Sequence, residues 1–262
     1  MSENIYIHGT ENEEQNRLAS LNDMTNKSFL NFIELRKNDK VLDVGSGLGL
    51  LAKEVALKIP DGNVTGLEKS EEQLKQCPSS ISNLTFIKGD AHNMPFDDNS
   101  YDVVYCRYIL EHVTNPLKVL NEVRRVLVNG GRLFVQENNI LAIEMYPECP
   151  HFKKAWQKFA LLQYELGGDA LIGKKLYSLL KKSGFKKIEL SPAPEFHYYD
   201  LKTFGPWIEN LIGNIEGARK KLTDYKLLTE EEIKNAINEL QNFITLDDAS
   251  TYFYWNRASA VK

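Results

Sequence analysis

The stretch VLDVGSGLG, residues 41–49, combines one acid with three glycines at alternate positions. Asp43 comes first, and Gly45, Gly47 and Gly49 follow it. Glycine adopts positive φ and has no side chain, so this spacing makes a bend whose backbone amides a ligand can approach closely. A carboxylate beside that bend attracts a cationic group and repels a pyrophosphate. The stretch therefore predicts a binding site for a small ligand that carries positive charge.

Apolar runs of strand length alternate with helical segments around this bend. Strands are predicted at VLDVG, NVTGLE, NLTFIKG, YDVVYCRY, RLFVQE and KKIEL, and the closing stretch TYFYWNRASAVK is rich in β-branched and aromatic residues. Largely apolar strands that alternate with helices predict a parallel sheet covered on both faces. With right-handed crossovers, the expected fold is α/β and doubly wound. We expect a Rossmann-like, mostly parallel sheet of seven strands whose last strand is antiparallel.

Helical segments interrupt this alternation twice after Glu137. They fall within residues 140–170 and 200–245, and we expect them to form a cap over the C-terminal ends of the strands, where ligands bind in open α/β sheets. An amphipathic segment within residues 1–38 precedes the first strand. The expected organisation is a single domain over residues 1–262, with an N-terminal helical lid in 1–38, a cofactor-binding half in 39–137 and the two cap insertions.

The composition argues against several classes of function. The net charge is −4, and no run of Lys and Arg is long enough to follow nucleic-acid phosphates. No stretch approaches the roughly 20 apolar residues that a membrane span needs, and the N-terminus has no apolar signal core. The three cysteines are widely spaced and odd in number, which is typical of a reduced compartment and fits neither a disulfide framework nor a zinc site. We therefore expect a cytoplasmic monomer or homodimer with no metal, no nucleic-acid partner and no membrane span.

Five motifs, in order along the chain, resemble those of the class I S-adenosylmethionine-dependent methyltransferases. They are VLDVGSGLG, Glu68 at the end of the second strand, KGDAHNMPF, YDVVYCRYILEHV and LVNGGRLFVQE, where Asn129 stands at a position that is commonly proline. The resemblance covers residues 38–137 well and the rest loosely. The N-terminal segment YIHGTENEEQNRL is further similar to small-molecule (type 11) methyltransferases related to the quinone-biosynthesis methyltransferases.

This resemblance implies that S-adenosylmethionine is the cofactor and S-adenosylhomocysteine the product. In the family, the acid at Glu68 accepts hydrogen bonds from both ribose hydroxyls, and the acid at Asp90 accepts from the adenine amino group. Both roles suit a carboxylate, which only accepts hydrogen bonds. Arg17 in the lid is expected at the methionine carboxylate. The other expected cofactor-binding residues are Asp43, Gly45, Ser46, Gly47, Gly49, Glu68, Lys69, Asp90, Ala91, His92, Cys106 and Arg107.

Two alternatives stay open at this point. A nicotinamide-dependent oxidoreductase has the same architecture. Gly45 and Gly47 match the first two glycines of its G-x-G-x-x-G pattern, but Leu50 stands where the third glycine is required. Asp43 would also repel a pyrophosphate. A non-catalytic S-adenosylmethionine-binding protein is the second alternative, because the sequence shows no recognisable acceptor site.

Methyl transfer is an in-line displacement from a sulfonium, and its thioether leaving group needs no acid. Alignment and exclusion of water are the main demands, and a base is needed only where the nucleophile must lose a proton. No catalytic triad is expected. The candidates for a base are Glu137, His112 and His8.

The acceptor pocket is expected between the end of the fifth strand and the cap. The fold does not determine whether O, N, S or C is methylated. The sequence therefore predicts transfer of a methyl group to a small-molecule acceptor of unspecified identity. The candidate acceptor contacts are Tyr6, Asn138, His151, Tyr164 and Tyr198, with Trp156, Phe159 and Trp207 as an aromatic lining.

Overall fold

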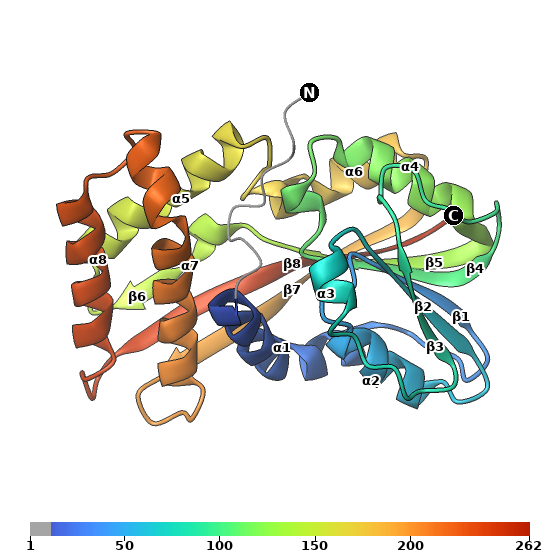
Figure 1. Cartoon of the computed structure of the whole chain (residues 1–262), viewed down its shortest axis with the longest axis horizontal. Coiled ribbons are helices and arrows are strands. Elements are labelled where there is room, and N and C mark those ends of the chain that lie inside the picture. The colour runs from blue at the N-terminus through green and yellow to red at the C-terminus, as the bar shows by residue number, and fades with distance from the viewer. Residues whose placement is uncertain (1–11) are drawn as a thin grey trace.

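The computed structural model describes the backbone of residues 12–262 and the side chains of residues 17–262. A mixed sheet with helices on both faces runs through the molecule (Figure 1). Its parallel part has the strand order β3-β2-β1-β4-β5. These strands are β1 (Lys40–Val44), β2 (Asn63–Glu68), β3 (Leu84–Lys88), β4 (Tyr101–Arg107) and β5 (Leu127–Glu137).

The C-terminal strand β8 (Ser250–Val261) continues the sheet antiparallel to β5. It also pairs with β7 (Lys186–Tyr198) and, at its far end, with the short β6 (Glu144–Tyr146). The predicted Rossmann-like, mostly parallel α/β fold is confirmed. Two details differ. The sheet has eight strands where seven were expected, because β6 is too short to give a periodic signal. β7 also extends well beyond KKIEL, which the sequence did not indicate because Pro192 and Pro194 conceal its strand pattern.

Alternate residues of the strands enter different hydrophobic cores. Val41 of β1 packs in a core with α1 (Asn12–Phe32) and α2 (Leu50–Lys58), and Leu42 packs in a core with α4 (Pro116–Val126) and α6 (Leu176–Lys182). This alternation is the period of two that a pleated strand requires when both faces are covered. The short α3 (Glu71–Leu74) follows β2. Because β1 and β2 are parallel, the turns that follow them lie at the same end of the sheet.

A third core lies beyond the parallel strands, where α5 (Pro150–Glu165), α7 (Phe204–Asp224) and α8 (Glu230–Phe243) gather around the far end of β8 (Figure 1, left). We call these three helices the cap. Phe253 and Trp255 of β8 belong to the same core. α1 also contacts α7, so the N-terminal helix bridges the sheet and the cap.

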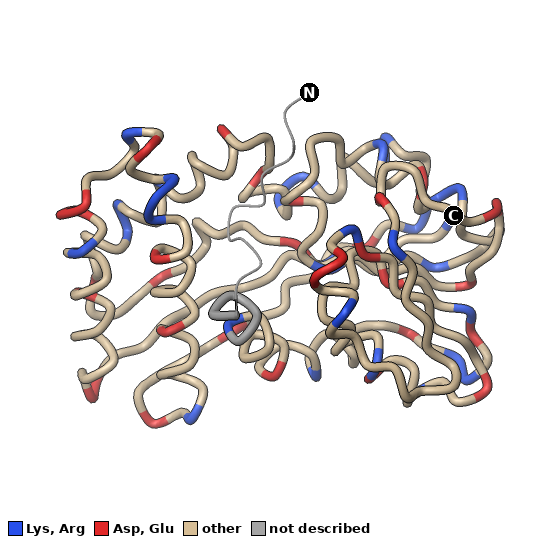
Figure 2. Tube along the Cα trace, viewed as in Figure 1, with Lys and Arg blue, Asp and Glu red and all other residues tan. Residues whose placement is uncertain are grey.

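Charged residues of both signs are spread along the described chain. Figure 2 shows Lys and Arg interspersed with Asp and Glu over both the sheet and the cap. Within residues 12–262, no helix has the length and apolar character needed to cross a bilayer.

Candidate functional site

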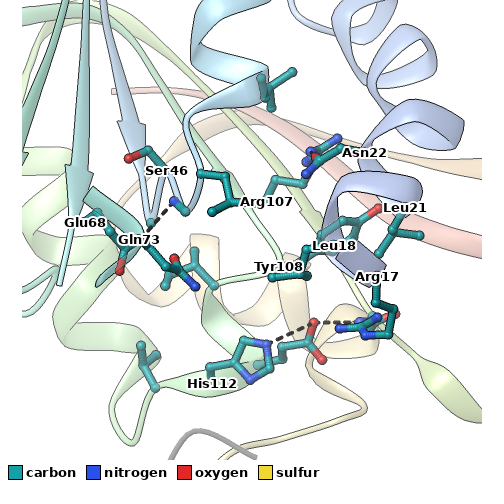
Figure 3. Close-up of a pocket in the computed structure, with 18 of the residues that line it drawn as sticks. Arg17, Leu18, Leu21, Asn22, Ser46, Glu68, Gln73, Arg107, Tyr108 and His112 are labelled. Atoms are coloured by element: carbon teal, nitrogen blue, oxygen red, sulfur yellow. Dashed lines mark hydrogen bonds and ion pairs between the residues drawn. The ribbon is translucent and has the colours of Figure 1, made fainter. Parts of the chain in front are cut away.

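A cavity of about 430 Å³ lies where the parallel strands end against the cap. Figure 3 shows Ser46 and Glu68 on one side of it and Arg17 on the other. We call its two parts the cofactor half and the cap half. The cofactor half is lined by Asp43, Gly45, Ser46, Gly47, Glu68, Lys69, Asp90, Ala91 and His92, and the cap half by Glu111, His112, Asn138, Trp156, Phe159, Gln163, Trp207, Asn210 and Trp255.

The turn after β1 is built from backbone. Gly45 and Gly47 have φ values of 74° and 56°, which side-chain-bearing residues rarely adopt. The amides of Gly45 and Ser46 both donate to the Leu67 carbonyl, at 2.8 and 3.0 Å, and so fix the turn against β2. A Cβ at Gly45 would lie 2.7 Å from Cδ1 of Ile109. Only glycine therefore keeps both the bend and the space beside it.

The Glu68 carboxylate is anchored at the end of β2 by backbone amides. Its Oε2 accepts from Gly47 at 2.9 Å, and its Oε1 accepts from Lys69 and Ser70, each at 2.8 Å. An ionised carboxylate has about four acceptor positions. The three amides fix the group and leave capacity for a donor from a ligand.

Asp90 sits between a cation and an imidazole after β3. Its Oδ1 accepts from the backbone amide of His92 at 2.9 Å and lies 2.7 Å from Nδ1 of that ring, and Lys69 Nζ donates to Oδ2 at 3.1 Å. Partial burial raises the pKa of Asp90, but these hydrogen bonds outweigh it and bring the pKa to about 2. Asp90 is therefore a carboxylate acceptor at neutral pH.

Two polar atoms of residues that line the cofactor half are buried without a partner among the described residues. They are Oγ of Ser46 and Nε2 of His92. Buried polar groups are normally hydrogen-bonded, so each unpaired atom indicates a missing partner. Together with the glycine turn and the two anchored carboxylates, they fit a ligand with several hydrogen-bonding groups, as a nucleoside has.

Asp43 is the most deeply buried charge of the cofactor half. Burial raises its pKa to about 7, and the Tyr105 hydroxyl and Arg107 guanidinium nearby offset only part of that effect. A cation bound beside Asp43 would favour the carboxylate form. The site thus suits the ammonium group of an amino acid moiety.

Aromatic rings line the cap half. Trp156 and Phe159 of α5 stack with ring centroids 5.1 Å apart and planes at 10°. The ring centroid of Trp207 of α7 lies 5.8 Å from that of Phe253 and 6.4 Å from that of Trp255. Apolar walls with a few polar groups are typical of pockets for small, partly apolar ligands.

A carboxylate and an imidazole form the polar part of the cap half. Glu111 is only 3% exposed, and its carboxylate accepts from Asn138 Nδ2 at 2.6 Å and from Gln163 Nε2 at 3.3 Å. His112 Nε2 lies 3.8 Å from Oε1 of Glu111, the contact dashed beside His112 in Figure 3. Both residues belong to the 3-10 turn η1 (Leu110–His112) after β4. His112 was expected from the sequence, whereas the burial of Glu111 becomes visible only in the structure.

Glu137, an expected base, does not line this cavity. Its carboxylate accepts from the amides of Ile109, Leu110 and Glu111, at 3.1, 2.8 and 3.3 Å. Burial and the adjacent Glu111 raise its pKa well above the ordinary value. Glu137 therefore holds the turn that carries Glu111 and His112.

Two expected cofactor contacts lie outside the cavity lining. Cys106 is fully buried in the core under α4 and α6, because its place on β4 directs it to the opposite side. Gly49 has φ 70° at the start of α2, and a Cβ there would lie 2.4 Å from Phe86 Cζ. Gly49 is thus required for packing.

Three expected acceptor contacts also point elsewhere. His151 is exposed near the start of α5, Tyr164 is 70% exposed on that helix, and Tyr198 is 47% exposed at the end of β7. None of the three lines the cavity, since each lies on the outer side of an element whose inner side packs in the cap. Tyr6 and His8 lie outside the described residues.

Arg17 and Arg107 line the cavity, and both also contact side chains of the helices around it. Arg17 Nη1 donates to Oδ1 of Asn210 at 2.6 Å, and its stem passes Gly213, so it ties α1 to α7. Arg107 donates to Asn22 of α1 and lies over the Phe29 ring. The proposed contact of Arg17 with a methionine carboxylate stays a prediction.

Several lining residues were not singled out from the sequence. Gln163, Asn210, Asn214, Phe253 and Trp255 come from helices and a strand that are far apart in sequence, and no local motif marks them. The aromatic character of α5 and of the start of α7 was the available signal.

In the described part of the chain, no three His, Cys, Asp or Glu side chains form a group that could hold a metal ion.

Comparisons with known proteins agree with this architecture. The chain is 33% identical over 167 residues to a demethylmenaquinone methyltransferase of Staphylococcus epidermidis, covering 61% of this chain and 66% of that protein. It is 31% identical over 125 residues to an uncharacterized methyltransferase of Schizosaccharomyces pombe, covering 44% and 45% of the two chains. The crystal structure of a putative methyltransferase from Bacillus halodurans has a TM-score of 0.60 at 22% identity, covering 90% of this chain and 98% of that one.

The chain thus spans between about half and two thirds of the length of these two curated relatives. Residues 35–184, more than half of the chain, match the family model described as "Methyltransferase domain". The matched region includes the glycine turn, Glu68, Asp90 and the turn that carries Glu111 and His112. The chain therefore belongs to the methyltransferase domain family, within the class I methyltransferases that use S-adenosylmethionine.

Proposed function

We propose that this protein transfers a methyl group from S-adenosylmethionine to a small-molecule acceptor held in the cap half. The observation that carries the proposal is the continuity of the cavity. Anchored carboxylates and a glycine turn line one half, and aromatic rings with a buried carboxylate line the other. The likeness to a demethylmenaquinone methyltransferase also favours a small, partly apolar acceptor.

The cofactor half binds and orients. S-adenosylmethionine, when bound, supplies a methyl group on a positively charged sulfur. Glu68 would accept from the ribose, and Asp90 with His92 would hold the adenine. Asp43 would offset the ammonium charge, and the turn at Gly45 and Gly47 would give the ligand access to backbone amides.

The lid and cap exclude water. Leu18 and Leu21 of α1 line the cavity, and the hydrogen bond between Arg17 and Asn210 joins α1 to α7. A covered site keeps water from competing with the acceptor and strengthens the electrostatic interactions inside. The α1–α7 contact is thus proposed to align the acceptor with the cofactor half.

Glu111 and His112 are proposed to receive the proton of an acceptor that carries one. Both line the cap half, and Asn138 and Gln163 fix the Glu111 carboxylate. A correctly placed base typically accelerates such a step by about 10²–10⁴-fold. The role of Glu137 is to hold the backbone of this turn.

The test combines binding and transfer. Calorimetry is expected to show binding of S-adenosylhomocysteine and none of NADH. A fractionated metabolite extract incubated with a labelled methyl donor is then expected to yield a labelled small molecule. Binding without any transfer would favour a non-catalytic binding protein, and selective binding of NADH would favour the oxidoreductase.

A further inference from the structure

The far ends of β6, β7 and β8 carry a face of large side chains that no other described residues cover. Along β8, Phe253 and Trp255 are buried in the cap core, and Tyr252 and Tyr254 lie on the opposite face. The alternation along β7 is the same. Ala193 and His197 are buried, whereas the neighbouring even-numbered residues are exposed. One side of this ribbon thus covers the cavity, and the other faces outward.

Cross-strand pairing places the outward residues in contiguous rows. Phe196 lies opposite Tyr252 with ring centroids 5.6 Å apart, and Pro194 lies opposite Tyr254. Nearer the parallel strands, α6 buries Ala258 on this same face. We call the uncovered remainder the aromatic face, which consists of Tyr146, Pro192, Pro194, Phe196, Tyr198, Tyr252 and Tyr254.

The aromatic face is comparable in size to the largest apolar patch of a typical monomer, which is often functional. Its five aromatic side chains are between 42% and 64% exposed. At about 200 Å² for each such side chain, they present roughly 500 Å², and the two prolines add to this area. A partner in a standard interface contributes about 800 Å². Patches of this size on soluble proteins are often binding surfaces, and Tyr and Phe are enriched in interfaces.

The edge of β7 is protected against pairing with another strand. Pro192 and Pro194 stand two residues apart, so both ring nitrogens face the same side, and the ladder to β8 continues past them on the other side. The free edge therefore lacks two N–H donors. This part of β7 is therefore a poor template for a further strand, which favours contact through the aromatic face.

We propose that the aromatic face is the surface through which two copies of this chain associate. A two-fold interface places a patch against itself, so like charges within it would repel. Among the outward-facing residues of these strand ends, the one charged residue is Glu144, which is paired with Tyr252 and lies on the outer strand β6. This self-compatible, nearly uncharged surface favours a second copy, and the proposal does not depend on the proposed function.

The oligomeric state of the full chain tests this proposal. Sedimentation velocity over a range of concentrations is expected to show a species of twice 30.0 kDa. Tyr252→Glu puts a charge at the centre of the face and is expected to raise the dimer dissociation constant at least about 30-fold. Tyr252 is half exposed, so the fold should tolerate the change, and Phe196→Ser provides a second variant if it does not. Tyr164→Glu, on the exposed side of α5, is the matched control and should leave the dimer intact.

Three outcomes would overturn the proposal. One is a wild-type protein that stays monomeric at every concentration. Another is a dimer that neither Tyr252→Glu nor Phe196→Ser weakens. The third is a monomer that dimerises through this face only after residues 1–11 are removed, since those residues would then be the natural cover.

Discussion

The two halves of the cavity are built in different ways. In the cofactor half, the binding groups come from turns directly after β1, β2 and β3, and backbone amides fix Glu68 and Asp90. In the cap half, the lining comes from α5, α7, β8 and η1, which are far apart in sequence. The first half is specified locally, by glycines and acids at strand ends. The second depends on how separate elements pack. Proteins of this fold can therefore differ in the acceptor that the cap half binds while they share the cofactor half.

The largest expected effect is on the glycine turn. Gly45→Val should weaken binding of S-adenosylhomocysteine about 1000-fold, because positive φ and the clash with Ile109 together make the ligand-binding shape of the turn about 4 kcal/mol less favourable. Calorimetry measures the affinity, and circular dichroism checks the fold. Gly205→Val is the matched control, since a Cβ at Gly205 meets nothing within 4 Å. An unchanged affinity would show that no ligand approaches this turn.

The cap half should separate catalysis from cofactor binding. Glu111→Gln keeps the shape of the side chain but removes its charge, so methyl transfer to an acceptor that loses a proton should slow about 100-fold. The affinity for S-adenosylhomocysteine should change by less than about twofold, because Glu111 lies in the other half of the cavity. The same variant with equal losses in both measurements would contradict the division into halves.

Glu68 should have the opposite profile. Glu68→Gln removes a charged acceptor and is expected to weaken the binding of S-adenosylhomocysteine by about 1–3 kcal/mol. The unfolding temperature is recorded to check that the variant is folded. Glu72→Gln, on the adjacent α3, serves as the control because that carboxylate is exposed. The assigned ribose role would be wrong if both variants bound equally well.

The smallest effect concerns Asp43 and pH. Its pKa is raised to about 7, mainly by burial, so the free protein is largely protonated there at pH 6 and ionised at pH 8. A bound ammonium group favours the carboxylate, and binding below pH 7 must therefore release a proton. The affinity for S-adenosylhomocysteine should fall up to about tenfold from pH 8 to pH 6. Calorimetry in two buffers counts that proton, and Asp43→Asn should abolish the dependence. A wild-type affinity that does not change with pH would contradict the placement of the cation.

The difference between the halves also explains what could be predicted from sequence. The glycine spacing, Glu68 and Asp90 follow from local chemistry, and the strand alternation predicts the sheet that brings them together. Glu137 illustrates the limit. An acid at the end of β5 is expected to face the cavity, but the amides of η1 draw its carboxylate away from it. Gln163 and Asn210 carry no local signal, because only the packing of α5 and α7 on the sheet brings them to the cavity.

A crystal structure of the protein with S-adenosylhomocysteine tests the central claim most directly. We expect the ribose at Glu68, the adenine beside Asp90 and His92, and the sulfur facing the cap half. A nucleoside found elsewhere, or no binding at saturating concentration, would contradict it.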